Sequence, residues 1–399
     1  MRLHRSPVPR LLTACALGLV ALGFPQGAAR AQGCAPTDLP PLNACSGPAR
    51  VSLAIVGDVL LHTALAERGY LRGFETIWGD ATPLLRAADL AIANLEGPLA
   101  RGMTRNGEQR ADPGPRVDGT VYSDYPAFNY HPVVAEALRE AGLDVVTTAN
   151  NHALDRGSRG VTATLDALDA ARIAHVGAVR PGHPRWQPLR LRTAIGPLSL
   201  IACTFGTNGI PDPAAQVPRC YDDETALLRL VAEEASRGHG VLVLPHWGQE
   251  YSLTPDARQT ALARRLAEAG AMAVVGTHPH VPQPWEIRET PRGRVPVVYS
   301  TGNFVAAQPP LERATGVMAW LSLCAGPRGP RVAGAGYVGL QMEFDGADPS
   351  LTLPRPGMGA RAEAGLALLA RLIPGRDLGP QAACTRARRP AAPLVIPDR

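Results

Sequence analysis

The sequence predicts an α/β fold built around a largely parallel sheet. From residue 51 onward, short apolar runs rich in valine and isoleucine alternate with segments of helical pattern. Strands separated by helices of ten or more residues are typical of βαβ units. Histidines follow several of these runs, and open α/β sheets carry their chemistry at the carboxyl ends of their strands. With 45% hydrophobic residues, the chain has ample material for a core.

The expected elements follow one another in βαβ order. Each expected strand is a short apolar run, and these runs lie at 51–56, 90–93, 144–149, 173–176, 198–204, 241–245, 273–275 and 296–300. Apolar residues at helical spacing predict helices at 82–88, 132–140, 161–171, 223–236, 256–269 and 362–372. Segments 186–204 and 332–344 have the spacing of antiparallel strands, whereas 102–124 is a long polar loop.

The N-terminal segment 1–31 has the layout of a secretory signal peptide. Three arginines precede an apolar stretch at 11–24, and Ala29-Arg30-Ala31 offers small residues for cleavage. We therefore expect export to the periplasm or the extracellular space. The alternative is a lipoprotein anchored at Cys15 or Cys34, whose sequence contexts match a lipoprotein box only weakly.

The rest of the chain is expected to divide into three parts. Residues 32–49 form a leader, 50–310 form the α/β domain, and 311–399 form a C-terminal extension. The pattern of strands weakens from Pro309. The last residues of the extension are rich in proline and arginine, and we expect a poorly ordered tail there.

The charge balance argues against nucleic-acid binding. The formal net charge of +5 includes four arginines and no acid in residues 1–31, so the remaining chain carries +1. So small an excess implies no basic face. The chain also contains no lysine, which excludes catalysis through a lysine Schiff base.

Six cysteines remain beyond residue 31, and an even number in an exported protein favours disulfides. Proximity in sequence pairs Cys34 with Cys45 and Cys203 with Cys220. Cys324 and Cys384 are then left over.

Potential metal ligands follow the expected strands. His246 ends one apolar run, His278 and His280 follow another, and Asn151 and His152 follow a third. Two acids and a further histidine lie in similar settings, namely Asp58, Glu96 and His62. Imidazole, carboxylate and amide groups together suit zinc, manganese or iron, and lack the all-oxygen character of a calcium site. The sequence therefore predicts a metal centre.

Six ordered motifs carry a resemblance to a known family. They are Gly57-Asp58, Ala93-Asn94-Leu95-Glu96, Ala149-Asn150-Asn151-His152-Ala153-Leu154-Asp155-Arg156-Gly157, His246-Trp247-Gly248-Gln249-Glu250-Tyr251, Gly276-Thr277-His278-Pro279-His280 and Tyr299-Ser300-Thr301-Gly302-Asn303-Phe304. Over about residues 51–305 the chain resembles the capsule synthesis protein CapA family, which is associated with poly-γ-glutamate capsules. That family is similar to calcineurin-like metallophosphoesterases. The resemblance implies a four-layer metallophosphoesterase-like β-sandwich flanked by helices.

The resemblance also implies roles for individual residues. Two divalent metal ions (zinc, manganese or iron) are expected, one held by Asp58 and His280 with His62 as a further candidate, the other by Asn151, His246 and His278. Glu96 takes the place of a bridging carboxylate. His152 would act as general acid, steadied by Asp155, and Asn150, Glu250 and Asn303 are expected to bind substrate.

Several of these residues have simpler explanations. His62 could lie on the following helix and face solvent, and Glu96 could cap a helix N-terminus. Glu250 and Asp155 could be supporting or surface groups, and Asn303 could hold a loop.

The chain departs from the phosphoesterase pattern in two places. Where those enzymes have Asp-x-His, this chain has Asp58-Val59-Leu60, and their bridging aspartate is replaced by Glu96. The leading hypothesis is an exported metal-dependent hydrolase that acts on an anionic polymer or a phosphoester, with capsule-assembly membrane proteins as candidate partners. The alternative is a non-catalytic protein that binds or escorts an anionic polymer.

Overall fold

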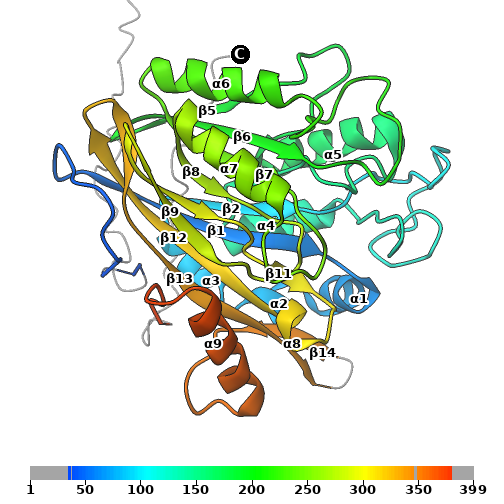
Figure 1. Ribbon diagram of the computed structural model, residues 1–399. Coiled ribbons are helices and arrows are strands. Elements are labelled where there is room, and N and C mark those ends of the chain that lie inside the picture. Colours follow the sequence, from blue (N-terminus) through cyan, green and yellow to red (C-terminus); the bar gives the residue numbers. More distant parts are fainter. Residues whose placement is uncertain (1–34, 37, 346–347, 380–399) are drawn as a thin grey trace, which may run out of the picture.

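The computed structural model describes residues 35–36, 38–345 and 348–379, and Figure 1 shows two stacked sheets with helices outside them. The larger sheet has eight strands in the order β14-β13-β12-β1-β2-β3-β4, and β11 pairs with the end of β1. The smaller sheet has six strands in the order β5-β6-β7-β8-β10-β9. Neighbouring strands from β1 to β4 and from β6 to β8 are parallel.

The bounds of the elements are as follows. The strands of the larger sheet are β1 (Arg50–Leu60), β2 (Leu90–Leu95), β3 (Val145–Thr147), β4 (Ala174–Val176), β11 (Asn303–Ala306), β12 (Thr315–Gly326), β13 (Gly329–Asp345) and β14 (Asp348–Thr352). Those of the smaller sheet are β5 (Leu189–Thr193), β6 (Gly196–Thr204), β7 (Gly240–His246), β8 (Ala271–Val275), β9 (Trp285–Thr290) and β10 (Gly293–Val298). The helices are α1 (Thr63–Arg72), α2 (Glu75–Trp78), α3 (Thr82–Ala87), α4 (Val133–Ala141), α5 (Gly157–Ala171), α6 (Glu224–Ser236), α7 (Ala257–Ala269), α8 (Leu311–Ala314) and α9 (Ala360–Leu372).

Three apolar cores define four layers. The central core lies between the sheets, where Leu53 and Ile55 of β1 pack with Leu200 and Leu242 of the smaller sheet. A second core lies beneath α1 to α4 on the outer face of the larger sheet. A third lies beneath α6 and α7 on the smaller sheet, and Figure 1 shows these two helices on the opposite side from α2 and α3. The expected four-layer α/β sandwich is therefore confirmed.

The predicted strands and helices all form, but the sequence pattern missed several elements. The most important is β12, which pairs antiparallel with β1 along Arg50–Ile55. Its sequence is a continuous apolar run because both faces are buried, so it lacks the alternation that marks a one-sided strand. As a result, the segment beyond residue 310 supplies strands to the interior of the larger sheet and does not form a separate sheet.

One of the two expected disulfides is wrong and the other is confirmed. Cys45 pairs with Cys324, with 5.7 Å between their Cα atoms, and not with Cys34. The physical reason is that the leader runs along the larger sheet: the Leu42 N–H donates to the carbonyl of Ala333, which brings Cys45 to the end of β12. Cys203 pairs with Cys220, as expected.

Some predictions concern residues outside the described part of the chain. These are the signal peptide at 1–31, the cysteines Cys34 and Cys384, and the tail at 380–399. Among the helices of the described residues, none has the length and apolar character needed to cross a membrane.

Candidate metal centre

The two sheets bring the carboxyl ends of their parallel strands together. In the larger sheet, Asp58 of β1 lies in register with Asn94 of β2 on one side and Asn303 of β11 on the other. In the smaller sheet, His246 ends β7 and forms a backbone bridge to Thr277, two residues beyond the end of β8. The side chains from the two sheets meet, since Nδ1 of His246 lies 3.8 Å from Oδ1 of Asp58.

Gly57 permits the close approach on which this meeting depends. A Cβ atom at position 57 would lie 1.7 Å from the carbonyl oxygen of Gly302. Any side chain there would push β1 away from the segment that leads into β11, and would displace Asp58 from Asn303. The Gly57-Asp58 pair is therefore a requirement of the site's geometry.

Five buried side chains form the centre of the site. They fall into two groups whose ligand atoms lie within 4.8 Å of one another: Glu96 with His278 and His280, and Asp58 with Glu96 and His246. Glu96 belongs to both groups. Its Oε1 lies 3.6 Å from Nε2 of His246 and 3.8 Å from Nε2 of His280, while Nδ1 of His280 lies 3.1 Å from Oδ2 of Asp58.

The Glu96 carboxylate is buried without a hydrogen bond. Glu96 is 0% exposed, and neither of its oxygens has a hydrogen-bond partner among the described residues. Nδ1 of His278 is likewise buried and unpartnered. Buried polar atoms in native proteins are nearly always satisfied, so these orphaned atoms, a carboxylate and an imidazole nitrogen, fit the coordination of a divalent cation.

The charges around Glu96 favour its ionised form. Burial raises the pKa of Glu96, but the charges of His280 and His246 outweigh burial and hold the pKa below its ordinary value. Burial lowers the pKa of His280, but Glu96 and Asp58 raise it to about 9. For His278, burial and the neighbouring histidines lower the pKa well below its ordinary value, so this imidazole is neutral at pH 7 and offers a lone pair.

Backbone strain concentrates at this site. Six non-glycine residues of the described chain have a positive φ, and three of them are His278 (99°), His280 (59°) and Tyr251 (65°). A positive φ costs free energy in a residue with a side chain, and such strain gathers where a site requires a particular orientation. The strain turns both imidazoles of the His278-Pro279-His280 segment toward Glu96.

Asn94 is a member of the site that the sequence interpretation did not assign. Its Nδ2 donates to Oδ1 of Asp58 at 2.8 Å and lies 3.2 Å from Nδ1 of His246. Its Oδ1 accepts from Thr147 and Asn150. The signal was present in the sequence, because side chains two residues apart on a strand share a face and Asn94 precedes Glu96 by two.

The expected ligand Asn151 joins the centre, whereas Asn150 supports it. Oδ1 of Asn151 lies 2.8 Å from Nε2 of His246, so both atoms point to the same region. Asn150 instead donates to the carbonyl of Leu95 at 2.7 Å and to Asn94. Asn150 therefore ties the loop after β3 to β2, and its amide nitrogen is engaged within the protein.

His152 and Asp155 form a hydrogen-bonded pair beside the centre. Nδ1 of His152 lies 2.7 Å from Oδ2 of Asp155, which also accepts the N–H of Phe128. The Phe128 ring packs edge-on against His152, with 4.7 Å between centroids. Burial lowers the pKa of His152, but the hydrogen bond and charge of Asp155 raise it above its ordinary value.

The remaining expected residues lie around the centre. Nδ1 of His62 accepts the N–H of Ala307 at 3.3 Å, and His62 belongs to neither group of clustered ligand atoms in the described chain. Asn303 orients His280, since its Oδ1 lies 2.9 Å from Nδ1 of that residue. Glu250 is exposed, in the loop that follows β7.

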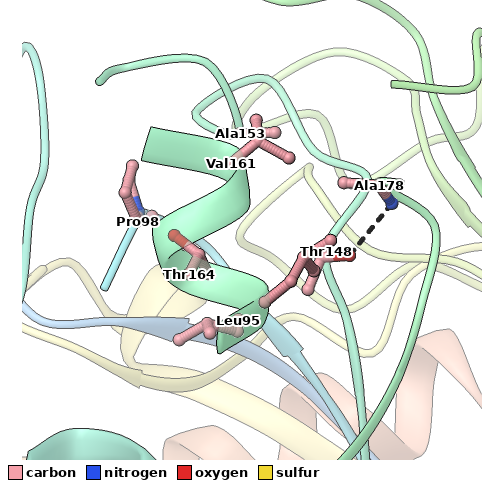
Figure 2. Close-up of a pocket in the computed structure, with 9 residues that line it drawn as sticks. Leu95, Pro98, Thr148, Ala153, Val161, Thr164 and Ala178 are labelled. Carbon is pink, nitrogen blue, oxygen red and sulfur yellow. Dashed lines mark hydrogen bonds between the residues drawn. The ribbon is translucent and has the colours of Figure 1, made fainter. Parts of the chain in front are cut away.

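A small cavity behind the site belongs to its packing. Figure 2 shows Val161 and Thr164 of α5 among the residues that line it, with Leu95 and Thr148 from neighbouring segments, and the hydrogen bond from the Ala178 N–H to Thr148. The cavity has a volume of about 10 Å³ and contains no acid, histidine or cysteine in its lining. The cavity is therefore a small packing gap beside α5, and its lining has no side chain suited to catalysis or metal binding.

Comparison with known proteins places this site in a family. The family model described as "Bacterial capsule synthesis protein PGA_cap" matches residues 52–308. The chain is 27% identical over 270 residues to the capsule biosynthesis protein CapA of Bacillus anthracis, covering 65% of this chain and 60% of that protein. It is 27% identical over 266 residues to the PGA biosynthesis protein CapA of Bacillus subtilis, covering 65% and 64%.

Two further likenesses are to a curated protein and to a solved structure. A probable polyglutamine synthesis accessory protein of Mycobacterium tuberculosis is 29% identical over 254 residues, covering 57% of this chain and 59% of that protein. Among solved structures, the calcineurin-like phosphoesterase YfkN from Bacillus subtilis has a TM-score of 0.42 at 14% identity, covering 81% of this chain and 96% of that one.

These alignments leave part of each relative unmatched. The chain spans about three fifths of the length of the curated relatives it matches. The family match itself covers more than half of this chain and contains every residue of the candidate metal centre. The resemblance found in the six motifs is therefore confirmed, and the chain belongs to the bacterial capsule synthesis protein family.

Proposed function

We propose that this protein is an exported, divalent-metal-dependent hydrolase of the phosphoesterase type that acts in the biosynthesis of a capsule or another anionic cell-surface polymer. The observation that carries the proposal is the Glu96 carboxylate, buried without a hydrogen bond among three imidazoles. Family membership supports the polymer context.

The proposed ligands divide between two positions that share Glu96. Asp58 and His280, with His62 as a further candidate, would hold one ion, while Asn151, His246 and His278 would hold the other. Bound divalent ions supply a nucleophilic hydroxide at neutral pH and stabilise the oxygens of an in-line displacement. Asn94 would orient Asp58 and His246 through its amide nitrogen.

His152 is the proposed general acid, and Asp155 is the residue that positions it. Because Nδ1–H of His152 donates to Asp155, Nε2 is the nitrogen that remains to pass a proton to a leaving group. Asp155 is itself fixed by the N–H of Phe128. Asn303 and Glu250 remain candidates for contact with substrate.

A non-catalytic escort for an anionic polymer is the second candidate. It is favoured by Leu60, which stands where phosphoesterases carry the histidine of Asp-x-His. Leu60 is 3% exposed and belongs to the apolar core beneath the outer helices, so it supplies no ligand. One of the two metal positions therefore has fewer ligands than the other.

Two measurements on the purified full chain test the proposal. Metal analysis after incubation with zinc, manganese and iron should find bound metal. Turnover of p-nitrophenyl phosphate mono- and diesters should then be lost in His152→Ala and kept in His183→Ala, a matched change at an exposed histidine. A folded, metal-loaded protein without turnover, whose binding of polyglutamate is unaffected by His152→Ala, would favour the escort.

A further inference from the structure

Tyr251 lies at the rim of the metal centre and is fixed to its histidine loop. The backbone N–H of Tyr251 donates to the carbonyl of Pro279 at 2.7 Å, between the two ligand candidates His278 and His280. The Tyr251 ring lies 6.1 Å from the ring of His280, measured between centroids. Tyr251 is also 41% exposed, so one part of it faces solvent while its backbone belongs to the site.

Arg313 of α8 lies against this tyrosine. Its guanidinium carbon is 3.5 Å from the centroid of the Tyr251 ring, the geometry of a cation–π contact. A second connection runs through the backbone, because Nδ2 of Asn303 donates to the Arg313 carbonyl at 2.9 Å and Oδ1 of Asn303 contacts His280. Arg313 is therefore connected to His280 by two routes. Its guanidinium contacts the Tyr251 ring, and its carbonyl accepts from Asn303, whose side chain also contacts His280.

The charge of Arg313 is not matched within the described chain. No described carboxylate forms a salt bridge with its guanidinium, whereas other partly exposed arginines, such as Arg180 and Arg185, each pair with aspartates. A guanidinium that lies flat on an aromatic ring keeps its N–H groups free at its edge. Those N–H groups match the two oxygens of a carboxylate or a phosphate.

Tyr251 is one of the few large hydrophobic side chains that are exposed. In the described part of the chain, the others are Leu71, Tyr125 and Met358. Burial is the largest cause that raises the pKa of Tyr251; the carboxylate of Glu250 also raises it, and the charge of Arg313 lowers it. A solvent-facing tyrosine ring and a cation without a salt bridge among the described residues thus lie together at the mouth of the metal centre.

We propose that Arg313, held against Tyr251, binds an oxyanion of the substrate at the mouth of the metal centre. The substrate is then a molecule with a second oxyanion, a carboxylate or a phosphate, beside the group held at the centre. This inference rests on the proposed function and deepens it, since it names a residue that would bind a second negative charge of the substrate. Arg313 is therefore a substrate-binding residue, and Tyr251 is the residue that positions it.

Calorimetric titration of the metal-loaded full chain tests this assignment. A γ-linked glutamate oligomer and inorganic phosphate are the two probes. Arg313→Ala should weaken binding about tenfold or more, the usual effect of losing a hydrogen bond to a charged group. Arg313→Lys should restore only part of the loss, because an ammonium group cannot bind a carboxylate in bidentate fashion.

A second arginine–tyrosine pair supplies the matched control. The guanidinium carbon of Arg258 lies 3.9 Å from the ring of Tyr221, in the outer helix layer. Arg258→Ala removes the same kind of contact and should leave the binding of both probes unchanged. Metal content and melting temperature, measured for each variant, distinguish a lost contact from a lost site.

The two probes identify the oxyanion. A loss with the glutamate oligomer assigns a carboxylate to Arg313, and a loss with phosphate alone assigns a phosphate. Wild-type affinity of Arg313→Ala for both probes overturns the inference, whether or not the protein hydrolyses esters. Binding that depends on Arg313 in a protein without turnover would instead overturn the hydrolase proposal and leave this inference standing.

Discussion

Two buried glutamates of this protein differ in the hydrogen bonds that their carboxylates accept. Glu96 and Glu234 are both 0% exposed, and the pKa of each lies below its ordinary value. Glu234, in α6, accepts hydrogen bonds from Arg190 at both carboxylate oxygens, at 2.8 and 2.9 Å, and further ones from Ser199 and Arg237. Glu96 accepts none.

This difference distinguishes Glu234, a structural carboxylate, from Glu96, whose oxygens can still bind a ligand. Burying a charge costs several kcal/mol unless it is paired and hydrogen-bonded. At Glu234 the protein itself supplies the partners that offset this cost. At Glu96 the neighbours are imidazoles 3.6 and 3.8 Å away, which lowers the cost by charge but leaves both oxygens free.

The comparison also shows that residue types alone do not identify a site. Ser199, His239 and Glu234 form a Ser-His-Glu cluster, the composition of a nucleophilic triad. In this cluster the Ser199 hydroxyl donates to Glu234 and not to the histidine, so the imidazole does not act as its base. The cluster is a satisfied ion-pair network.

The largest expected effect is the loss of metal in His246→Ala. His246 contacts Asn151 and lies beside both Asp58 and Glu96, so its removal takes a direct ligand from the centre. The affinity for metal should fall by more than the ~10–100-fold that outer partners of a metal site cost. The affinity of His62→Ala for metal should fall by less, because Nδ1 of His62 already accepts a hydrogen bond from the N–H of Ala307.

Calorimetric titration of the two variants with zinc and manganese measures this difference. Equal losses in His62→Ala and His246→Ala would make His62 a full ligand. The two metal positions would then be alike, and the case for hydrolysis by two metals would be stronger than the ligand count indicates.

Removal of the Cys203–Cys220 disulfide should lower the free energy of unfolding and leave the metal content unchanged. Cys203 lies on β6, where the next residue, Thr204, is in register with His246 of β7. The bond closes a loop of sequence separation 17, so Cys203→Ala/Cys220→Ala should lower the free energy of unfolding by about 3 kcal/mol. Denaturant unfolding gives this value, and metal analysis of the same variant should find an unchanged metal content. A parallel loss of metal would show that the bond positions His246.

The sequence revealed the centre because parallel strands place their carboxyl ends at one edge. Asp58 lies near the end of β1, His246 ends β7 and Glu96 follows β2, and this placement was predictable without coordinates. Arg313 and Tyr251 were not predictable in this way, because a short helix and a strained loop bring them to the rim. The Cys45–Cys324 bond was missed since 279 residues separate its cysteines, and the path of the leader along β13 is what brings Cys45 to the end of β12.

Replacement of Glu234 should have a smaller effect, one that depends on pH. Burial raises the pKa of Glu234, but Arg190 and Ser199 lower it to about 2. A carboxylate whose pKa is lower in the folded state stabilises the fold above its unfolded pKa, and this stabilisation disappears as the pH falls toward about 2. Glu234→Gln should therefore lower the free energy of unfolding by about 2 kcal/mol at pH 7.

Denaturant unfolding of wild type and Glu234→Gln from pH 7 downward checks the sign. The two curves should converge as the solution becomes acidic, since both proteins then carry a neutral group at this position. A difference that stays constant with pH would mean that shape, and not charge, explains the role of Glu234.

The most direct test is the thermal stability of Glu96→Gln, with and without metal, beside that of Glu234→Gln. A glutamine at position 96 keeps the shape of the side chain and removes the carboxylate charge that lies among the imidazoles. Because the pKa of both glutamates lies below its ordinary value, each charge stabilises the metal-free fold, and both variants should melt below the wild type when no metal is present. Added metal should raise the melting temperature of the wild type and of Glu234→Gln, but not that of Glu96→Gln. If added metal raises the melting temperature of Glu96→Gln as much as that of the wild type, then Glu96 is a structural carboxylate and holds no metal.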